Sequence, residues 1–216
     1  MAERNDKLRE EKETGRLEAF SDGVFAFAIT LLVLGLHDPT QGSTVGLLTG
    51  LIQEWPMFFA FFTSFITVLI MWVNHHNMFN FVRRIDVRFM FLNGFLLLWV
   101  TLTPFTTSLV ANHIDAVDAS TAAAVYSGAF LLLAVTWNFV WKYASTGQRL
   151  LASHVTIENV GGVNRDYNLG MAGYVAAFAL AFVNGLASII AILVLAAYFV
   201  YTPLRRESLR KRNELA

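Results

Sequence analysis

Long apolar runs alternate with short polar segments along this chain. Four runs are about 20 residues long or longer, the length that a helix needs to cross a bilayer core roughly 30 Å thick. The stretch 169–203 is too long for one span and slightly short for two, and Asn184-Gly185 near its middle favours a turn. We therefore predict six helices, and their residues are 17–36, 56–79, 89–110, 119–142, 169–183 and 186–203.

The positions of the basic residues fix the predicted orientation. All 16 lie before the first helix, between the second and third, at or after the end of the fourth, or after the sixth. They are Arg4, Lys7, Arg9, Lys12, Arg16, Arg83, Arg84, Arg88, Lys142, Arg149, Arg165, Arg205, Arg206, Arg210, Lys211 and Arg212. Cytoplasmic segments retain positive charge, so six spans place every one of them inside, with both termini cytoplasmic. Five spans would place the last five outside.

Composition agrees with a membrane protein. The chain is 56% hydrophobic and only 15% charged, whereas soluble domains are about a quarter charged. It has no cysteine, which excludes disulfides and thiolate metal sites. We divide it into a cytoplasmic tail at 1–15, a transmembrane domain at 16–206 and a second cytoplasmic tail at 207–216. The one sizeable loop, 143–168, is too small to be an enzyme domain, so we expect neither catalysis, nor a cofactor, nor a nucleic-acid partner.

The first predicted helix has two different faces. At about 100° per residue, one face combines apolar side chains with one threonine. Its residues are Arg16, Phe20, Gly23, Phe27, Thr30, Leu31 and Leu34. Asp22 points almost the opposite way and Ser21 to the side. An ionisable group inside a span is a functional candidate that needs partners from other helices. The alternative is that Arg16 and Asp22 only anchor the helix at the interface and that the stripe packs against other helices.

Polar residues near the inner ends of the second and third helices are possible partners. Trp72, His75 and His76 close the second helix, and Asn93 lies near the start of the third. Adjacent histidines point about 100° apart, so they are poorly placed to bind one metal. They could bond Ser21 and Asp22 instead, or serve as interfacial anchors. Pro104, among several threonines, predicts a structural kink whose backbone the hydroxyl groups help to satisfy.

The stretch Arg16-x-x-x-Phe20-Ser21-Asp22, running into Ile29-Thr30-Leu31, closely resembles the transmembrane protein 175 family, the lysosomal potassium channel family with many bacterial members. An Arg-x-x-x-Phe-Ser-Asp motif at the start of the first helix is the hallmark of this family. The end of the second helix, Asn93 and Pro104-Phe105 are also similar. One copy of a six-helix unit is the bacterial form, so the resemblance implies a multi-pass protein of the bacterial inner membrane.

The resemblance implies a homotetramer in the lipid bilayer, with a central pore lined by the first helix of each subunit. The positions that match the apolar constriction are Phe27, Leu31 and Leu34, with Thr30 beside them. A structural polar network is implied at Arg16, Phe20, Ser21, Asp22, Trp72, His75, His76 and Asn93, where either histidine could take part. At Phe27 the family usually has Ile or Leu. Four phenyl rings would either close the pore more tightly or offer their faces to a cation.

These expectations favour a potassium-over-sodium preferring cation channel gated at a hydrophobic constriction. The alternative is a proton- or solute-coupled carrier that uses Asp22 and the second-helix histidines as a relay. Carriers are typically built from internal repeats or paired broken helices, and the sequence has no clear pair.

Overall fold

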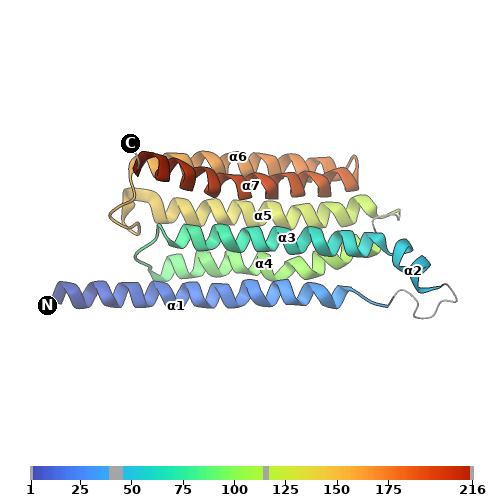
Figure 1. Ribbon diagram of the computed structural model, residues 1–216, viewed down its shortest axis with the longest axis horizontal. Helices are drawn as coiled ribbons and strands as arrows, with labels where there is room; N and C mark the ends of the chain where they lie inside the picture. The colour runs from blue at the N-terminus through green and yellow to red at the C-terminus, as the bar shows by residue number, and fades with distance from the viewer. Residues whose placement is uncertain (1, 39–45, 114–116, 215–216) are drawn as a thin grey trace.

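The computed structural model describes residues 2–38, 46–113 and 117–214, and the described chain is mainly helical. Its α-helices are α1 (Ala2–Leu31), α2 (Leu47–Gln53), α3 (Trp55–Phe79), α4 (Val87–His113), α5 (Ala119–Ser145), α6 (Ile157–Ala181) and α7 (Gly185–Glu214), with 3-10 turns at η1 (Leu32–Gly35) and η2 (Thr146–Gln148). Figure 1 shows the long helices side by side in one bundle, with the start of α1 and the end of α7 at the same end and the short α2 at the other. The prediction of an all-α fold is confirmed.

Five described segments are long and apolar enough to cross a membrane. They are Glu13–Gly35, Trp55–Phe79, Val87–His113, Ala119–Gln148 and Gly185–Thr202. Each covers one of the predicted apolar runs to within one residue. The remaining long helix, α6, lies beside α7 over most of its length (Figure 1), although its first half is polar. Helical backbone also continues from α1 and α7 into the two segments assigned to the tails.

The predicted loop at 143–168 is shorter in the structure, where the non-helical connection covers only 149–156. Helix α5 continues to Ser145, and α6 begins at Ile157, twelve residues before the predicted start at 169. Thr156 starts α6 with a capping box: its hydroxyl accepts from the Asn159 backbone N–H at 3.2 Å, and its own N–H donates to Asn159 Oδ1 at 3.0 Å. The polar residues of α6 that indicated a loop have helix partners instead, since Trp141 Nε1 of α5 donates to Asn164 Oδ1 at 2.8 Å.

The predicted turn at Asn184-Gly185 is confirmed. Asn184 caps α7, its Oδ1 accepting from the Ala187 N–H at 3.0 Å. Two glycines then allow α6 and α7 to pack closely: a Cβ atom at Gly170 would collide with the Phe199 ring, and one at Gly173 would collide with Leu195. Small residues commonly allow such approach between membrane helices, where packing replaces the hydrophobic driving force.

The loops at the end of the bundle that holds both termini are joined to one another. Val82 and Leu151 form an antiparallel bridge between the α3–α4 and α5–α6 connections. The backbone N–H of Arg83 donates to the Leu150 carbonyl at 2.9 Å, and that of Ala152 donates to the Phe81 carbonyl at 2.8 Å. These backbone hydrogen bonds tie the α3–α4 connection to the α5–α6 connection.

Asp86 lies at the centre of this joined end. Its Oδ1 accepts from the Phe89 N–H at 2.8 Å at the start of α4, and its Oδ2 accepts from the Tyr143 hydroxyl at 2.7 Å. The Arg149 guanidinium lies 3.9 Å from Oδ2 and stacks 4.5 Å from the centre of the Tyr143 ring. Partial desolvation alone would raise the pKa of Asp86, but the two hydrogen bonds and the Arg149 charge together outweigh it and hold the pKa below its ordinary value.

Candidate functional site

One face of α1 is left uncovered by the rest of the described chain. Phe20 is 63% exposed, Phe27 66% and Leu34 76%. Gly23 and Thr30 are also exposed, whereas Leu31 is half-buried. The Thr30 hydroxyl donates to the Phe27 carbonyl at 2.8 Å, one turn back on the helix. The face predicted from periodicity thus exists as a continuous stripe, and we call it the α1 stripe.

The opposite face of α1 packs into the bundle. Ser21 and Phe25 are completely buried, and Ala28 and Leu32 are nearly so. This face lies against α3 and α4. The helix therefore has one side fixed by its own chain and one side available to lipid, to another subunit or to an ion path.

A chain of three buried side chains joins α1, α4 and α3. His75 Nε2 donates to Asn93 Oδ1 at 2.9 Å, Asn93 Nδ2 donates to Ser21 Oγ at 2.9 Å, and Ser21 donates to the Leu17 carbonyl at 2.9 Å. The direction of each bond follows from chemistry, because an amide oxygen only accepts and an amide nitrogen only donates. All three side chains are 0% exposed. Of the two candidate histidines, His75 is the one that bonds Asn93.

Two further contacts join α1 to α3 beside this chain. Trp72 Nε1 donates to Asp22 Oδ1 at 2.9 Å. His76 Nδ1 lies 2.8 Å from Glu18 Oε1, in a pair that is partly open to solvent. The two histidines thus point to different partners, as expected from their 100° offset. Among the described residues, no cluster of three or more His, Cys, Asp or Glu side chains could hold a metal ion.

The structure brings together six of the eight residues predicted for the polar network. These six are Ser21, Asp22, Trp72, His75, His76 and Asn93. Arg16 and Phe20 are exposed on the side of the α1 stripe and do not reach the buried chain. Glu18 was not predicted, although it lies one turn before Asp22 and its spacing could have indicated a place on the same side of the helix.

Hydroxyl groups gather around the proline of α4. The Thr107 hydroxyl bonds the Thr103 carbonyl and Ser64 Oγ, both at 2.7 Å, and Ser64 in turn bonds the Tyr126 hydroxyl at 3.0 Å. Threonine hydroxyls bond the Trp99 and Thr103 carbonyls on either side of Val100, the residue whose carbonyl loses its N–H donor to Pro104, and α4 continues through the proline. The predicted role of the hydroxyls in satisfying the backbone freed by the proline stays a prediction. The link to Ser64 and Tyr126, on α3 and α5, was not predicted.

Asn74 joins α3 to α7, and sequence reasoning also missed this contact. Its amide donates to the Ile70 carbonyl at 2.8 Å and to the Phe199 carbonyl at 3.2 Å. In an α-helix the Phe199 carbonyl would accept from residue 203, but residue 203 is a proline and has no N–H. A proline four residues after a carbonyl is the sequence signal for such an unused acceptor.

Comparisons with known proteins agree with this architecture. The family described as endosomal/lysosomal potassium channel TMEM175 matches residues 16–104, the part that holds the α1 stripe and its network. A potassium channel of Chamaesiphon minutus is 47% identical over 88% of this chain and 95% of its own length. A potassium channel of Streptomyces collinus is 38% identical over 87% of this chain and 91% of its own length.

The chain is also similar to a solved bacterial channel structure and to a human protein. The crystal structure of a lysosomal potassium-selective channel TMEM175 homolog from Chamaesiphon minutus superposes with a TM-score of 0.80, at 44% identity, over 88% of this chain and 98% of that one. The human endosomal/lysosomal proton channel TMEM175 is 38% identical over 36% of this chain but only 17% of its own length.

The fold defines an all-helical, multi-pass membrane protein whose first helix is held by a buried polar network. The extent and identity of the matches place it among cation channels and not among enzymes. The chain belongs to the TMEM175 family.

Proposed function

We propose that the chain is a potassium-permeable cation channel, potassium-preferring over sodium, formed by four copies around a central pore. In this proposal six helices span the membrane and both termini are cytoplasmic. The α1 stripe lines the pore, with Phe27, Leu31 and Leu34 as the apolar constriction and Thr30 beside them. The potassium channels and the potassium-selective structure among the relatives support this assignment of the permeant ion.

One observation carries the proposal: α1 is fixed by its own subunit on one face only. Polar and apolar contacts hold Ser21, Phe25 and Leu32 against α3 and α4, while Phe27 and Leu34 protrude from the other side. A helix positioned this way can present bulky hydrocarbon to a symmetry axis without contributing to the core of its own bundle. Four such helices then enclose a narrow apolar passage.

The mechanism follows from the properties of an apolar constriction. A narrow hydrophobic passage loses water easily, so a small rotation or displacement of α1 switches it between wet and dry states. The Ser21–Asn93–His75 chain and the Asp22–Trp72 bond fix the rotation of α1 about its axis. They therefore determine which side chains meet the ion.

The proposed orientation rests on charge and on the joined end of the bundle. Both termini and the two connections that contain Arg83, Arg84 and Arg149 lie at one end. Basic residues are retained on the cytoplasmic side, so we assign this end to the cytoplasm. The half-polar α6 is the additional span that brings the number to six, and it crosses the membrane before α7. The polar contacts of its first half, such as that of Asn164, then lie near the cytoplasmic side.

Recording from purified protein in a planar bilayer tests ion permeation directly. Under opposed potassium and sodium gradients, we expect resolved unitary currents that reverse near the potassium equilibrium potential. Reversal near the sodium potential would contradict the selectivity. Flux without unitary steps, at the slow turnover of a carrier, would contradict the channel itself.

A further inference from the structure

Helix α7 continues beyond its apolar part as a strongly basic helix. Its backbone is helical from Gly185 to Glu214, whereas the segment apolar enough to span a membrane ends at Thr202. Five of the eight positions from 205 to 212 are Lys or Arg. Residues 203–214 contain only two acidic residues, so their net charge is +3. We call residues 203–214 the C-terminal basic segment.

The rise of the helix places these charges close to lipid headgroups. At about 1.5 Å per residue, Arg205 lies roughly 5 Å beyond Thr202, and Arg212 lies roughly 15 Å beyond it. The polar layer on each side of a bilayer is about 5–7 Å thick. Charges also act over a Debye length of about 8 Å at physiological salt. The whole C-terminal basic segment is therefore within electrostatic reach of the headgroups.

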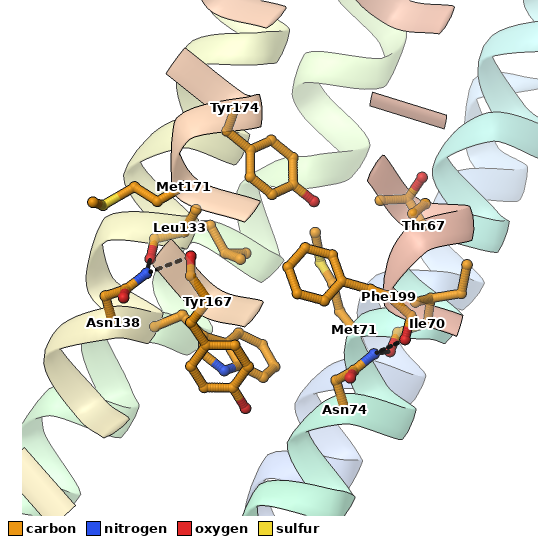
Figure 2. Close-up of a pocket in the computed structure, with 13 residues that line it drawn as sticks. Thr67, Ile70, Met71, Asn74, Leu133, Asn138, Tyr167, Met171, Tyr174 and Phe199 are labelled. Atoms are coloured by element: carbon orange, nitrogen blue, oxygen red, sulfur yellow. Dashed lines mark hydrogen bonds between the residues drawn. The ribbon is translucent and has the colours of Figure 1, made fainter. Parts of the chain in front are cut away.

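The base of the C-terminal basic segment is fixed to the bundle. Pro203 has no N–H to donate to the Phe199 carbonyl, and the Asn74 amide of α3 donates to that carbonyl at 3.2 Å instead (Figure 2). On α6, a Cβ atom at Gly170 would collide with the Phe199 ring, so the two helices are in close contact there. Helices α3 and α6 thus hold the last turn of α7 before Pro203, and the basic residues leave the bundle at a fixed depth.

Helix α1 provides a comparison within the same chain. Its backbone also continues as a helix outside the span, back to Ala2. Residues 2–15 contain four basic and five acidic residues, however, so their net charge is −1. Lys and Arg set the orientation of a membrane protein, and acidic residues contribute little to it. Orientation alone therefore does not account for the scarcity of acidic residues after α7, which indicates a partner that responds to net charge.

We propose that the C-terminal basic segment binds the headgroups of anionic phospholipids, such as phosphatidylglycerol, in the leaflet where α7 ends. Clusters of Lys and Arg directly after a membrane span attract such lipids, and each basic residue near the surface strengthens the attraction about fivefold. Arg205 and Arg206 lie at the depth of the phosphate groups, and the three later basic residues act over the Debye length. The assignment of this leaflet to the cytoplasmic side rests on the proposed function, whereas the lipid preference does not.

Native mass spectrometry of the purified full chain in detergent tests the lipid preference without any measurement of conduction. The wild type is titrated with phosphatidylglycerol and with phosphatidylcholine of the same acyl chains. We expect the anionic lipid to bind at least tenfold more tightly, because several basic residues contribute about fivefold each. Equal affinities for the two lipids would overturn the proposal.

Glutamine substitutions test where the lipid binds. A variant without the five basic residues should lose the preference, and a milder variant that lacks only the first two should lose at least fivefold of it. A control variant that lacks the four basic residues of 2–15 should keep it. An unchanged preference in both test variants, or an equal loss in the control, would overturn the assignment. The substitutions are Arg205→Gln, Arg206→Gln, Arg210→Gln, Lys211→Gln and Arg212→Gln in the test variants, and Arg4→Gln, Lys7→Gln, Arg9→Gln and Lys12→Gln in the control.

An epitope tag after Ala216 tests the leaflet separately. In intact spheroplasts the tag should resist an added protease, and it should be digested once the membrane is permeabilised. Digestion in intact spheroplasts would contradict the orientation in the proposed function and the assignment to the cytoplasmic leaflet. The titration with the two lipids would still decide whether the C-terminal basic segment binds anionic headgroups.

Discussion

At the scale of single residues, the two sides of α1 have different roles and should respond differently to substitution. Phe27 protrudes from the α1 stripe, so in the proposed pore its side chain acts through the width of the passage. Ser21, Asn93 and His75 are completely buried, so they act through the position of the helix. The structure therefore separates residues expected to change conduction from residues expected to change assembly and gating.

We predict that Phe27→Ala widens the proposed constriction and raises leak current, because in the proposed pore the truncation removes a ring from each of the four subunits. The current at equal tetramer abundance should increase, measured in liposomes or bilayers. Phe139→Ala is a matched control, since Phe139 on α5 is exposed to a similar degree, 61% against 66%. An equal or smaller current in Phe27→Ala would count against its place in the pore.

Asp22→Ala should mainly harm assembly or gating. The substitution leaves the Trp72 indole without its acceptor, and a hydrogen bond to a charged group contributes about 1.5–3 kcal/mol. We expect a lower midpoint of thermal unfolding and less tetramer by size-exclusion chromatography. Asp22→Asn keeps an oxygen acceptor and should recover part of the loss. Unchanged expression, assembly and current in Asp22→Ala would refute the role of this side chain.

At the scale of helices, sequence pattern predicted those elements that contain an apolar run long enough to span a membrane. Five predicted runs match, to within one residue, segments long and apolar enough to span a membrane, and Asn184-Gly185 predicted the α6–α7 turn. The start of α6 could not be predicted this way, since Asn164 and its polar neighbours resemble a loop until their partners on other helices are known. Hydrogen bonds such as that from Asn74 to the Phe199 carbonyl could not be predicted from sequence pattern either, because they join residues 125 apart in the sequence.

The same reasoning applies to the candidate site. The α1 stripe follows from helical periodicity alone, and the motif resemblance pointed to most of the network. Periodicity could not choose between His75 and His76, because the choice depends on how α3 rotates against α4. Periodicity placed Arg16 and Phe20 on the stripe, whereas the resemblance implied that they join the polar network; both are exposed on the stripe side.

Close packing of α6 on α7 predicts sensitivity at Gly170. Gly170→Ala places a methyl group against the Phe199 ring, and overpacking typically costs about 1–3 kcal/mol. We expect a lower unfolding midpoint by differential scanning fluorimetry. Gly161→Ala in the same helix has open space around its Cβ and should be neutral or slightly stabilising. Equal midpoints for the two variants would contradict the packing.

The Asp86 cluster predicts a dependence of stability on pH. Because the folded protein holds the pKa of Asp86 below its ordinary value, the carboxylate stabilises the fold above the unfolded pKa of about 3.9. That stabilisation is lost as the pH falls through the lower folded pKa. Asp86→Asn keeps a capping oxygen but removes the charge, so its unfolding midpoint should fall less than that of the wild type on acidification. Parallel pH profiles would contradict this account.

At the scale of the whole molecule, α3 and α4 hold one face of α1, and the described residues leave the α1 stripe exposed apart from the half-buried Leu31. Four stripes meeting at an axis would complete the passage, and the joined loops with their basic residues would form its cytoplasmic end. The proposed conduction of ions therefore depends on the α1 stripe, which can line a pore only after several copies of the chain assemble.

Cysteine modification tests that dependence most directly, because the chain contains no cysteine of its own. Leu34→Cys places one thiol on the α1 stripe, and Val194→Cys places one at a comparably exposed site on α7. A charged, membrane-impermeant thiol reagent applied during bilayer recording should block current through Leu34→Cys and leave current through Val194→Cys unchanged. Equal insensitivity of both variants, with labelling of the Leu34→Cys thiol confirmed by mass spectrometry, would show that the α1 stripe does not line the ion path.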